Sequence, residues 1–579
     1  MKNTLKPFIL LFAGWIVLIG SSYAQRQRIS DNHTILLYNR NGIIPFKRLD
    51  TMKIAVVTPN KSAYPCLVRM LQKYGEVTSF DFSNDAENTK AFNTIILVGS
   101  AQELNQNILL RYRQLASAGK NVIVCSFLEN KYALYGQNPR FGGQMTEMVS
   151  NGKDCVAQEN MAMSIFGGMS ITQGLSINRT EQTRLQYAQT TLHIRNKEEL
   201  TKKIDAIAAE AIQAKATPGM VVMALKNNQV LFEKSYGYHT YEKKQPTQLD
   251  DIFDLASISK IVGTTPVIMH LQEQGKIDLE KTIGDYLEDA AETNKADIPL
   301  RTVLLHEAGF TPFIPFYKDL KKGDLQTYFS DTHQTKVADG VYLLTDYYKN
   351  VMWPEMLKSS VKSTGNYVYS DISMYVMKEV VEQVSSTPLN KYVSDFLYKP
   401  IGMKTAGYNP RDRFESSRIV PTQQDMVFRK VLLQGYVHDE GAAMAGGIAG
   451  HAGLFATAND LAIYGQMLLN RGEYGGVRYF QGTTIDLFTS RQSSRSRRGL
   501  GFDRYDPNSK NGYPSKLSNN SVYGHTGYTG TCIWIDPKNQ LVYIFLSNRV
   551  HPQVTNKLID LNIRGRIQDA IYETILNKR

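Results

Sequence analysis

The chain has 579 residues, of which 42% are hydrophobic and 21% are charged. This is an ordinary globular composition, and it excludes collagen-like, disordered and coiled-coil classes. At roughly 150 residues per domain, the length indicates two to four domains. The formal net charge of +12 is a mild excess over this length. The basic run from Arg491 to Arg498 is rich in serine, and we interpret it as a solvated loop rather than a nucleic-acid surface.

The N-terminus has the order of a secretory signal peptide. Lys2 and Lys6 precede an apolar run from Phe8 to Ile19, and Ser22-Tyr23-Ala24 follows. The run is short for a membrane span, and no cysteine lies nearby to accept a lipid. We therefore expect residues 1–24 to be removed after Ala24. The mature chain would be periplasmic or secreted and would keep no stable membrane span.

Cysteine usage points away from a disulfide scaffold and from zinc. Only four cysteines occur, at positions 66, 125, 155 and 532, and their spacing matches no zinc pattern. Cys125 lies in the apolar run NVIVCSF and is predicted to be a buried thiol. One disulfide is compatible with an oxidising compartment, and its pairing stays open.

Residues 25–190 are predicted to form an α/β domain. Short apolar runs at 53–59, 77–82, 94–100 and 121–127 are typical of buried strands, and segments with helical spacing at 64–74 and 106–119 lie between them. Strands that alternate with helices predict a mostly parallel sheet with helices on both faces.

Residues 195–579 are predicted to form an α+β domain. An amphipathic helix at 198–214 is followed by two strands, 220–226 and 229–238, around Asn227-Asn228. Two further strands, 531–537 and 541–548, and a long helix from about Asn556 to Leu576 close the chain. We expect one antiparallel sheet built from both ends of this domain, beside an inserted helical subdomain.

Ser257 and Lys260 form the pattern S-x-x-K at the start of a long apolar helix. Residues three apart share a helix face, so the ammonium can reach the hydroxyl. A lysine whose pKa is lowered by burial and nearby cations could take the serine proton. The pattern also begins at Ser117, Ser150 and Ser359, and about two chance matches are expected from ordinary composition. Only Ser257 stands between a strand-like run and an apolar helix.

Two more motifs follow in order, Tyr369-Ser370-Asp371 and His525-Thr526-Gly527. The series Ser-x-x-Lys, Tyr-Ser-Asp and His-Thr-Gly resembles the β-lactamase and penicillin-binding-protein superfamily, whose third motif is usually Lys-Thr-Gly. It is most similar to the class C-like branch, which includes esterases and D-amino-acid-specific peptidases. Supporting stretches are LLHEAGF (304–310) and GYVHDEGAAMAGGIAGHAGLF (435–455). The resemblance covers roughly residues 198–579.

The resemblance implies a role for each matching residue. Ser257 would attack an acyl carbonyl, and Lys260 and Tyr369 would share the general-base work. The backbone N–H groups of Ser257 and Tyr528 would form the oxyanion hole. His525 would orient Tyr369 or contact the substrate. The residues expected to bind substrate are Asp371, Thr526, Gly527 and His438.

Two departures bear on the substrate. His525 replaces the usual lysine, so the fixed cation that meets a β-lactam carboxylate is missing, and histidine is only partly charged near neutral pH. Asp371 stands where many members carry asparagine, and an ionised Asp accepts hydrogen bonds without donating them. Both changes argue against β-lactamase activity and leave acyl transfer through Ser257 in place.

The other histidines are weaker candidates for site residues. His438-Asp439 and His451 lie in Gly-rich sequence, where they could line the pocket, but we favour a role in capping or bracing loops. His306-Glu307 lacks the H-E-x-x-H spacing of a zinc peptidase. No metal or cofactor is expected.

The start of the predicted mature chain resembles a second family. NHTILLYNRNGIIPFKRLDTMKIAVVTP (32–59) and IFGGMSITQGLSIN (165–178) are similar to the C-terminal α/β domain of family 3 glycoside hydrolases. The barrel that carries the nucleophile in that family has no counterpart here, so this domain is expected to be a catalytically inert remnant or accessory. Packing against the hydrolase or binding of sugar are hypotheses for its role.

Two classes of function follow. The first is an exported serine hydrolase that acts on an ester, an amide or a D-amino-acid-containing peptide, including peptidoglycan fragments. The second is a non-catalytic envelope protein that binds glycan or peptide, with a glycosidase-associated accessory as a weaker third. The set Ser257, Lys260 and Tyr369 favours the first.

Overall fold

The computed structural model describes residues 34–83, 88–128, 143–173, 179–187, 194–362, 364–510 and 512–576. Internal contacts divide the chain into two compact units, residues 1–188 and 189–579, which are described separately. The predicted signal peptide lies outside the described residues. No helix in the described ranges is long and apolar enough to cross a membrane.

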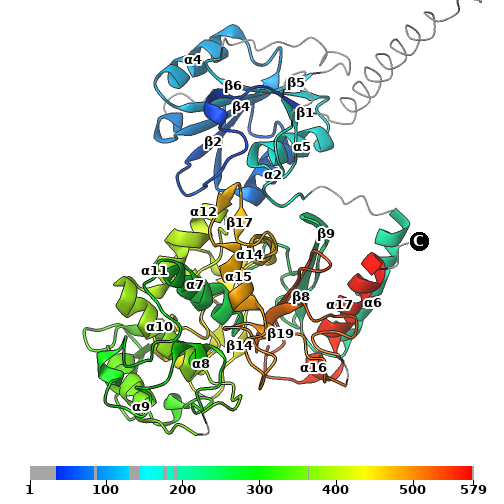
Figure 1. Cartoon of the computed structure of the whole chain (residues 1–579). Helices are drawn as coiled ribbons and strands as arrows, with labels where there is room; N and C mark the ends of the chain where they lie inside the picture. The colour runs from blue at the N-terminus through cyan, green and yellow to red at the C-terminus, as the bar shows by residue number, and fades with distance from the viewer. Residues whose placement is uncertain are drawn as a thin grey trace, which may run out of the picture. The chain divides into compact units, whose positions relative to one another are not determined.

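The first unit is built on a seven-stranded sheet in the order β3-β2-β4-β5-β6-β1-β7 (Figure 1). The predicted mostly parallel sheet is confirmed, and the four predicted strands are β2 to β5. Three strands were not predicted, and one of them, β1, runs antiparallel to β6. The strands are β1 (Thr34–Tyr38), β2 (Ile54–Thr58), β3 (Val77–Asp81), β4 (Thr94–Ser100), β5 (Asn121–Leu128), β6 (Thr146–Asn151) and β7 (Thr172–Gln173).

Helices α2 (Pro65–Tyr74), α4 (Gln106–Ser117) and α5 (Cys155–Phe166) cover this sheet. Ala55 and Val57 of β2 pack in one apolar cluster with Tyr112 and Ala116 of α4. Alternate residues of a strand face opposite sides, so β2 needs apolar residues throughout to be covered on both faces. A disulfide joins Cys66 of α2 to Cys155 of α5, whereas Cys125 is a buried free thiol as predicted.

The second unit contains a six-stranded antiparallel sheet in the order β19-β20-β21-β22-β8-β9. Strand β22, near the C-terminus, pairs with β8, so the sheet is built from both ends of the unit as predicted. The strands are β8 (Gly219–Lys226), β9 (Gln229–Gly237), β19 (Asp503–Arg504), β20 (Tyr523–Thr526), β21 (Cys532–Asp536) and β22 (Leu541–Ser547).

Two terminal helices, α6 (Ile194–Gln213) and α17 (Ile563–Leu576), pack against one face of this sheet in a single apolar cluster (Figure 1). The prediction of one helix from Asn556 to Leu576 was wrong. Asn562 has a left-handed φ of 48°, which an α-helix does not admit, so the segment divides into α16 (Lys557–Asp560) and α17.

Helix α14 (Ala458–Leu469) lies against β8, β21 and β22 of the same sheet, and α7 and α10 belong to the predicted helical part. That part also holds a small sheet, β11-β13-β12, which was not predicted. The other elements of this unit are η4 (Lys260–Thr264, a π-helical turn), α7 (Thr265–Glu273), α8 (Leu300–Leu304), β11 (Leu325–Gln326), β12 (Thr335–Ala338), β13 (Val341–Leu343), α9 (Trp353–Lys358), α10 (Ile372–Ser385), α11 (Leu389–Val393), α12 (Lys399–Ile401), α13 (Glu440–Met444) and α15 (Gly482–Thr489). Short paired strands are β10 (Phe253–Asp254) with β16 (Phe455–Ala456), β14 (Gln423–Gln424) with β15 (Leu432–Leu433), and β17 (Glu473–Tyr474) with β18 (Val477–Arg478).

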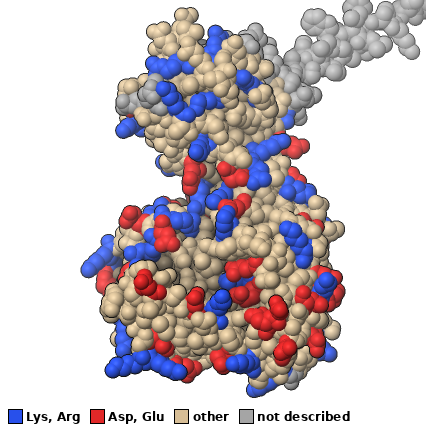
Figure 2. Space-filling model, turned by 90° about the vertical axis from the view of Figure 1, so that its left-hand side faces the viewer, with Lys and Arg blue, Asp and Glu red and all other residues tan. Residues whose placement is uncertain are grey.

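The basic excess is not gathered on the face shown in Figure 2, where Lys and Arg interleave with Asp and Glu over the larger unit. This mixture is typical of an ordinary solvated surface.

The Cys66–Cys155 disulfide spans a sequence separation of 89 residues, so it should restrict the unfolded first unit strongly. Replacing both cysteines with alanine is expected to lower the unfolding free energy of this unit by roughly 4 kcal/mol. Thermal melts with and without reductant check this. The matched control is Cys125→Ala, which removes a buried thiol but keeps the cross-link. A wild-type melt that does not respond to reductant would contradict the prediction.

Candidate active site

Ser257 follows a turn in which the backbone is held in an unusual conformation. Ala256 has a left-handed φ of 47°, which costs a non-glycine residue about 1 kcal/mol or more. The Asp254 carboxylate supports this turn, because it accepts the N–H groups of Ala256 at 2.9 Å and of His438 at 2.7 Å. Burial raises the pKa of Asp254 to about 6. The turn is thus fixed by a buried carboxylate on which two backbone amides converge.

Lys260 lies one helical turn after Ser257, at the start of η4, and its side chain is fully buried. Its Nζ donates to Ser257 Oγ at 3.0 Å, to Asp371 Oδ1 at 2.7 Å and to the His451 carbonyl at 3.4 Å. The predicted contact between ammonium and hydroxyl is present, and the partner of the ammonium is Asp371.

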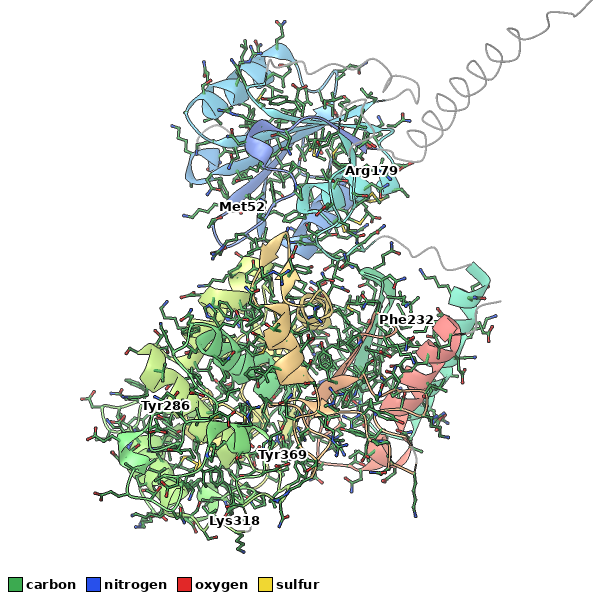
Figure 3. All side chains as sticks on the ribbon, viewed as in Figure 1. Met52, Arg179, Phe232, Tyr286, Lys318 and Tyr369 are labelled. Carbon is green, nitrogen blue, oxygen red and sulfur yellow. A yellow bond between two sulfur atoms is a disulfide. The ribbon has the colours of Figure 1, made fainter. Side chains whose placement is uncertain are left out.

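Tyr369 reaches the same hydroxyl from the segment before α10. Its OH donates to Ser257 Oγ at 3.0 Å, and Lys260 Nζ lies 4.8 Å from the centroid of its ring. Figure 3 labels Tyr369 in the larger unit. The structure therefore brings Ser257, Lys260 and Tyr369 together across a sequence separation of 112 residues.

The expected lowering of the Lys260 pKa was wrong. Burial lowers it, but the Asp371 carboxylate and, to a lesser extent, Tyr369 outweigh burial, so the pKa of Lys260 is raised above its ordinary value. Burial also raises the pKa of Tyr369, which Lys260 and Arg498 only partly oppose. At neutral pH the resting site holds an ammonium and a neutral phenol around the hydroxyl.

The turn after β20 brings a second backbone segment against the nucleophile. A Cβ on Gly527 would lie 2.4 Å from the Leu255 carbonyl oxygen, so only glycine allows this approach. Thr529 and Thr531 secure the contact, since their hydroxyls donate to the carbonyls of Asp254 at 2.8 Å and Leu255 at 3.2 Å. Tyr528 follows Gly527 in this turn, and within the described part of the chain neither its N–H nor that of Ser257 donates a hydrogen bond.

His525 is neutral and faces Arg498. Its Nδ1 donates to the Thr526 carbonyl at 2.7 Å, so its Nε2 is free to accept from Arg498 at 3.1 Å. Burial, with the charges of Arg498 and Lys260, lowers the pKa of His525 to about 3. The His525 and Tyr369 ring centroids are 6.1 Å apart, and no hydrogen bond joins the two among the described side chains.

Arg498 is a site residue that the sequence analysis missed. The interpretation of Arg491–Arg498 as a solvated loop fails at its end, where Arg498 is only 4% exposed. Its guanidinium donates to Tyr367 OH at 3.0 Å and lies 5.3 Å from the Tyr369 ring centroid. The sequence feature that could have indicated the burial of Arg498 is the apolar segment GLGF (499–502), which follows the basic run directly. Arg498 supplies a fixed cation where His525 supplies none.

Tyr528 and His438 lie close together. Their ring centroids are 5.5 Å apart, and the guanidinium of Arg549 covers the Tyr528 ring at 4.8 Å. Arg549 also donates to the Tyr528 carbonyl at 2.7 Å, which fixes this peptide. The Tyr528 residue is 52% exposed, so it can meet a bound molecule.

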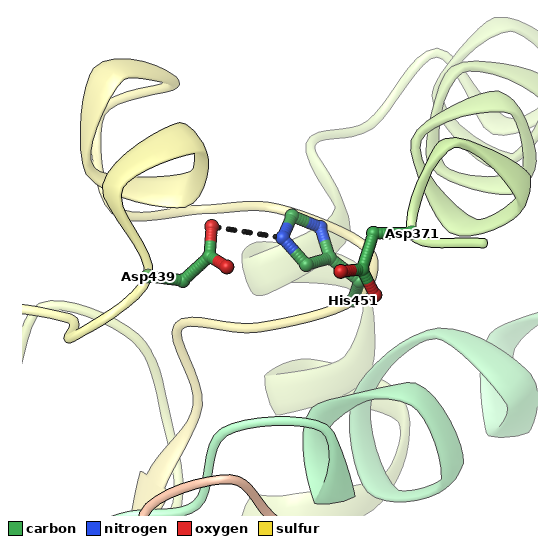
Figure 4. Close-up of side chains that lie close together, drawn as sticks. All are labelled: Asp371, Asp439 and His451. Carbon is green, nitrogen blue, oxygen red and sulfur yellow. Dashed lines mark hydrogen bonds and ion pairs between the residues drawn. The ribbon is translucent and has the colours of Figure 1, made fainter. Parts of the chain in front are cut away.

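Asp371, Asp439 and His451 form the group of side chains best placed to hold a metal ion, with ligand atoms within 4.8 Å of one another (Figure 4). Asp371 is already paired with the Lys260 ammonium, and His451 Nε2 is 3.0 Å from Asp439 Oδ1. A divalent cation bound to Asp371 would face that ammonium at close range, which is unfavourable. Asp439 also caps α13 by accepting the Ala442 N–H at 2.7 Å. The bracing role predicted for Asp439 and His451 is therefore confirmed.

Comparison with known proteins identifies a family and several relatives. Residues 204–565 match the family described as Beta-lactamase. A Salmonella agona protein named "Putative D-alanyl-D-alanine carboxypeptidase" is 29% identical over 393 residues, which cover 62% of this chain and 86% of that protein. A Salmonella typhi protein of the same name is 29% identical over 391 residues, with the same coverage.

Two solved structures to which this chain is similar are a hydrolase and a β-lactamase. EstCE1, a hydrolase with promiscuous acyltransferase activity, is 18% identical with a TM-score of 0.49, covering 65% of this chain and 99% of that chain. A class C β-lactamase from Rhodobacter sphaeroides is 19% identical with a TM-score of 0.47, again covering 65% and 99%.

Ser257 should be the residue modified by a fluorophosphonate probe, because its hydroxyl alone is contacted by both Lys260 and Tyr369. Ser257→Ala is expected to abolish labelling, as read by intact-protein mass spectrometry. Ser117→Ala is the matched control, since Ser117 begins another S-x-x-K and is exposed in the first unit. Labelling that survives in Ser257→Ala would contradict this assignment.

The labelling rate should rise with pH, since the acceptor of the Ser257 proton is neutral Lys260 or the Tyr369 phenolate, and the pKa of each is raised. The Asp371 carboxylate raises both values, so Asp371→Asn should lower both. We expect its pH profile to move to lower pH by about one pH unit or more. Stopped-flow labelling between pH 6 and pH 10 (about the ordinary pKa of a tyrosine) measures this. An unchanged or upward-shifted profile would rule out the Lys260–Asp371 pair as its cause.

Proposed function

The chain belongs to the beta-lactamase family and is a hydrolase of that family, and from this premise we propose that it cleaves peptides that end in a D-amino acid with a free carboxylate. The reaction proceeds through an acyl-enzyme on Ser257. The observation that carries the proposal is the buried Arg498 guanidinium beside His525 and Tyr369.

Arg498 is suited to recognise a carboxylate. A guanidinium binds a carboxylate through paired N–H groups, and a charged hydrogen bond of this kind is strong where water is excluded. Arg498 reaches both His525 and Tyr367, and Asp503 lies 3.7 Å from its Nε. Arg497 also donates to Asp503, at 2.7 Å, so the Asp503 carboxylate is shared by two arginines and does not fully neutralise Arg498. The Arg498 guanidinium therefore keeps a positive charge that can bind an anionic ligand.

The curated relatives support the same class of substrate. Proteins named "Putative D-alanyl-D-alanine carboxypeptidase" align with this chain over 86% of their length, so the similarity extends well beyond the three short motifs. The neutral His525 and the fixed Arg498 distinguish this site from one with a lysine in the third motif.

Proton movement in acylation follows from the contacts of Ser257. The Oγ–acyl carbon bond forms as the amide C–N bond breaks, and the serine proton passes through Tyr369 to the leaving amine. Lys260 keeps its charge and stabilises the reactive phenolate form of Tyr369, which takes the Ser257 proton and becomes a phenolate again when it gives that proton to the leaving amine. Water then attacks the acyl-enzyme, and its proton returns to Ser257 through the same phenol.

The carbonyl oxygen of the substrate is held by the two free backbone N–H groups of Ser257 and Tyr528. Such donors contribute on the order of 3 kcal/mol each to transition-state stabilisation. Thr526 and Gly527 lie along the edge where an extended peptide would bind. The contact of Gly527 with Leu255 sets the spacing of the two donors.

We also propose that residues 1–24 direct the chain to the cell envelope and that the first unit is an accessory that binds cell-wall glycan. These proposals rest on the N-terminal residue order and on the similarity of residues 31–180 to a glycoside hydrolase domain. Retention of the full chain on purified peptidoglycan, compared with a non-wall polysaccharide, tests the second. Equal retention on both supports removes it.

The substrate proposal predicts a specific defect in Arg498→Ala. For a D-alanyl peptide with a free carboxylate, kcat/KM should fall by roughly 10- to 100-fold, as expected for the loss of a charged hydrogen bond. For the same peptide with an amidated C-terminus, and for a short nitrophenyl ester, the loss should be much smaller. Arg495→Ala is the matched control, since Arg495 is a nearby arginine of the same loop whose side chain is exposed.

Equal losses on the free and amidated peptides would show that Arg498 does not read the carboxylate. Hydrolysis of nitrophenyl esters without any D-alanyl peptide would instead identify an esterase. Wild-type protein without turnover or Ser257 labelling would favour the non-catalytic binding protein.

A further inference from the structure

His306 occupies a backbone position that glycine usually takes. Helix α8 ends in the preceding turn, where the N–H of His306 donates to Val303 at 3.1 Å and that of Glu307 to Thr302 at 3.0 Å. At His306 the chain has a left-handed φ of 56°. A glycine adopts this conformation freely after a helix, whereas a side chain there is strained. The histidine therefore has to be explained by what its side chain contacts.

His306 contacts the residues directly before and directly after Tyr369. The His306 carbonyl accepts the N–H of Val368 at 2.9 Å, and its Nδ1 accepts the N–H of Ser370 at 3.3 Å. The imidazole lies against the phenol itself, with ring centroids 4.6 Å apart. The residue is only 1% exposed, so this arrangement has little room to vary.

The hydrogen bond from Ser370 also fixes the tautomer of His306. Nδ1 is the acceptor, so Nε2 carries the hydrogen, and within the described residues this buried N–H has no partner. Burial, and then the charges of Arg498 and Lys260, lower the pKa of His306 well below its ordinary value. A neutral ring can pack beside the phenol without adding a third cation to Lys260 and Arg498.

We propose that His306 is the positioning residue for Tyr369, holding the phenol at hydrogen-bond distance from Ser257 through the backbone on either side of it and through the ring. The proposal rests on the function proposed above. It assigns a use to a histidine whose sequence context fits no zinc site.

Three variants separate this role from a structural one. His306→Gly relieves the backbone strain at this position but removes the Nδ1 acceptor and the imidazole ring. His306→Asn also tolerates a left-handed φ, and its Oδ1 can take the place of Nδ1. Ser386→Gly is the matched control, because Ser386 has the same left-handed conformation (φ 49°) at the end of α10 and is exposed.

We expect His306→Gly to lower kcat by roughly 100-fold with KM nearly unchanged, since a small misplacement of a reacting group costs this much. His306→Asn should recover about tenfold of that loss. The pH profile of His306→Gly should move to higher pH, because a displaced Tyr369 loses the influence of Lys260 and Arg498. Ser386→Gly should keep wild-type kcat and pH profile. Thermal melts verify that all variants are folded.

Wild-type kcat in a folded His306→Gly would overturn the proposal, and so would an equal loss in His306→Asn and His306→Gly. A wild-type enzyme with neither turnover nor Ser257 labelling would overturn the proposed function, and this role with it. Active wild-type enzyme with unaffected His306 variants would overturn the positioning role alone.

Discussion

The buried ion pair between Lys260 and Asp371 is the constraint on which the site depends. It holds an ammonium 3.0 Å from the Ser257 hydroxyl in a place where burial alone would favour the neutral amine. A charged group in such surroundings is tolerable only when it is paired and hydrogen-bonded. The pair in turn rests on α10, which begins directly after Asp371, and on the His451 carbonyl. Three segments far apart in the chain thus converge on one charge.

The other ionisable side chains discussed at this site are either neutral or lie beside an opposite charge. His525 and His306 are neutral because burial and nearby cations disfavour their protonation. Arg498 is the second fixed cation, and Asp503 is held ionised beside it. The phenol of Tyr369 lies between two positive groups and two neutral rings. The charges of Lys260 and Arg498 favour the anionic form of the phenol between them.

Much of this could be predicted from the sequence, because hydrophobic periodicity and motif order are local signals. The parallel strands of the first unit, the two-ended antiparallel sheet and the contact of Lys260 with Ser257 follow from them, whereas the convergence with Tyr369 was implied by the family resemblance. Two of the misses share a cause, since the burial of Arg498 and the charge of Lys260 are decided by neighbours distant in sequence, Tyr367 and Asp371. The break at Asn562 has another cause, a single left-handed backbone angle. Strand β1 pairs with β6 more than a hundred residues later, so no local sequence pattern predicts this pairing.

The pairing of β22 with β8 has a consequence for biosynthesis. The sheet that presents Gly527 and Tyr528 to the nucleophile cannot be completed until the last strands have left the ribosome. Until then β8 lacks its partner β22, which follows it by about three hundred residues. Contacts between such remote partners are slow to form, since a long loop must be ordered first. A chain cut short before residue 541 would carry Ser257 and Lys260 and could still pair β8 with β9, but it would lack β22, which joins β8 to the strands that place Gly527 and Tyr528. We therefore expect activity only from a finished polypeptide.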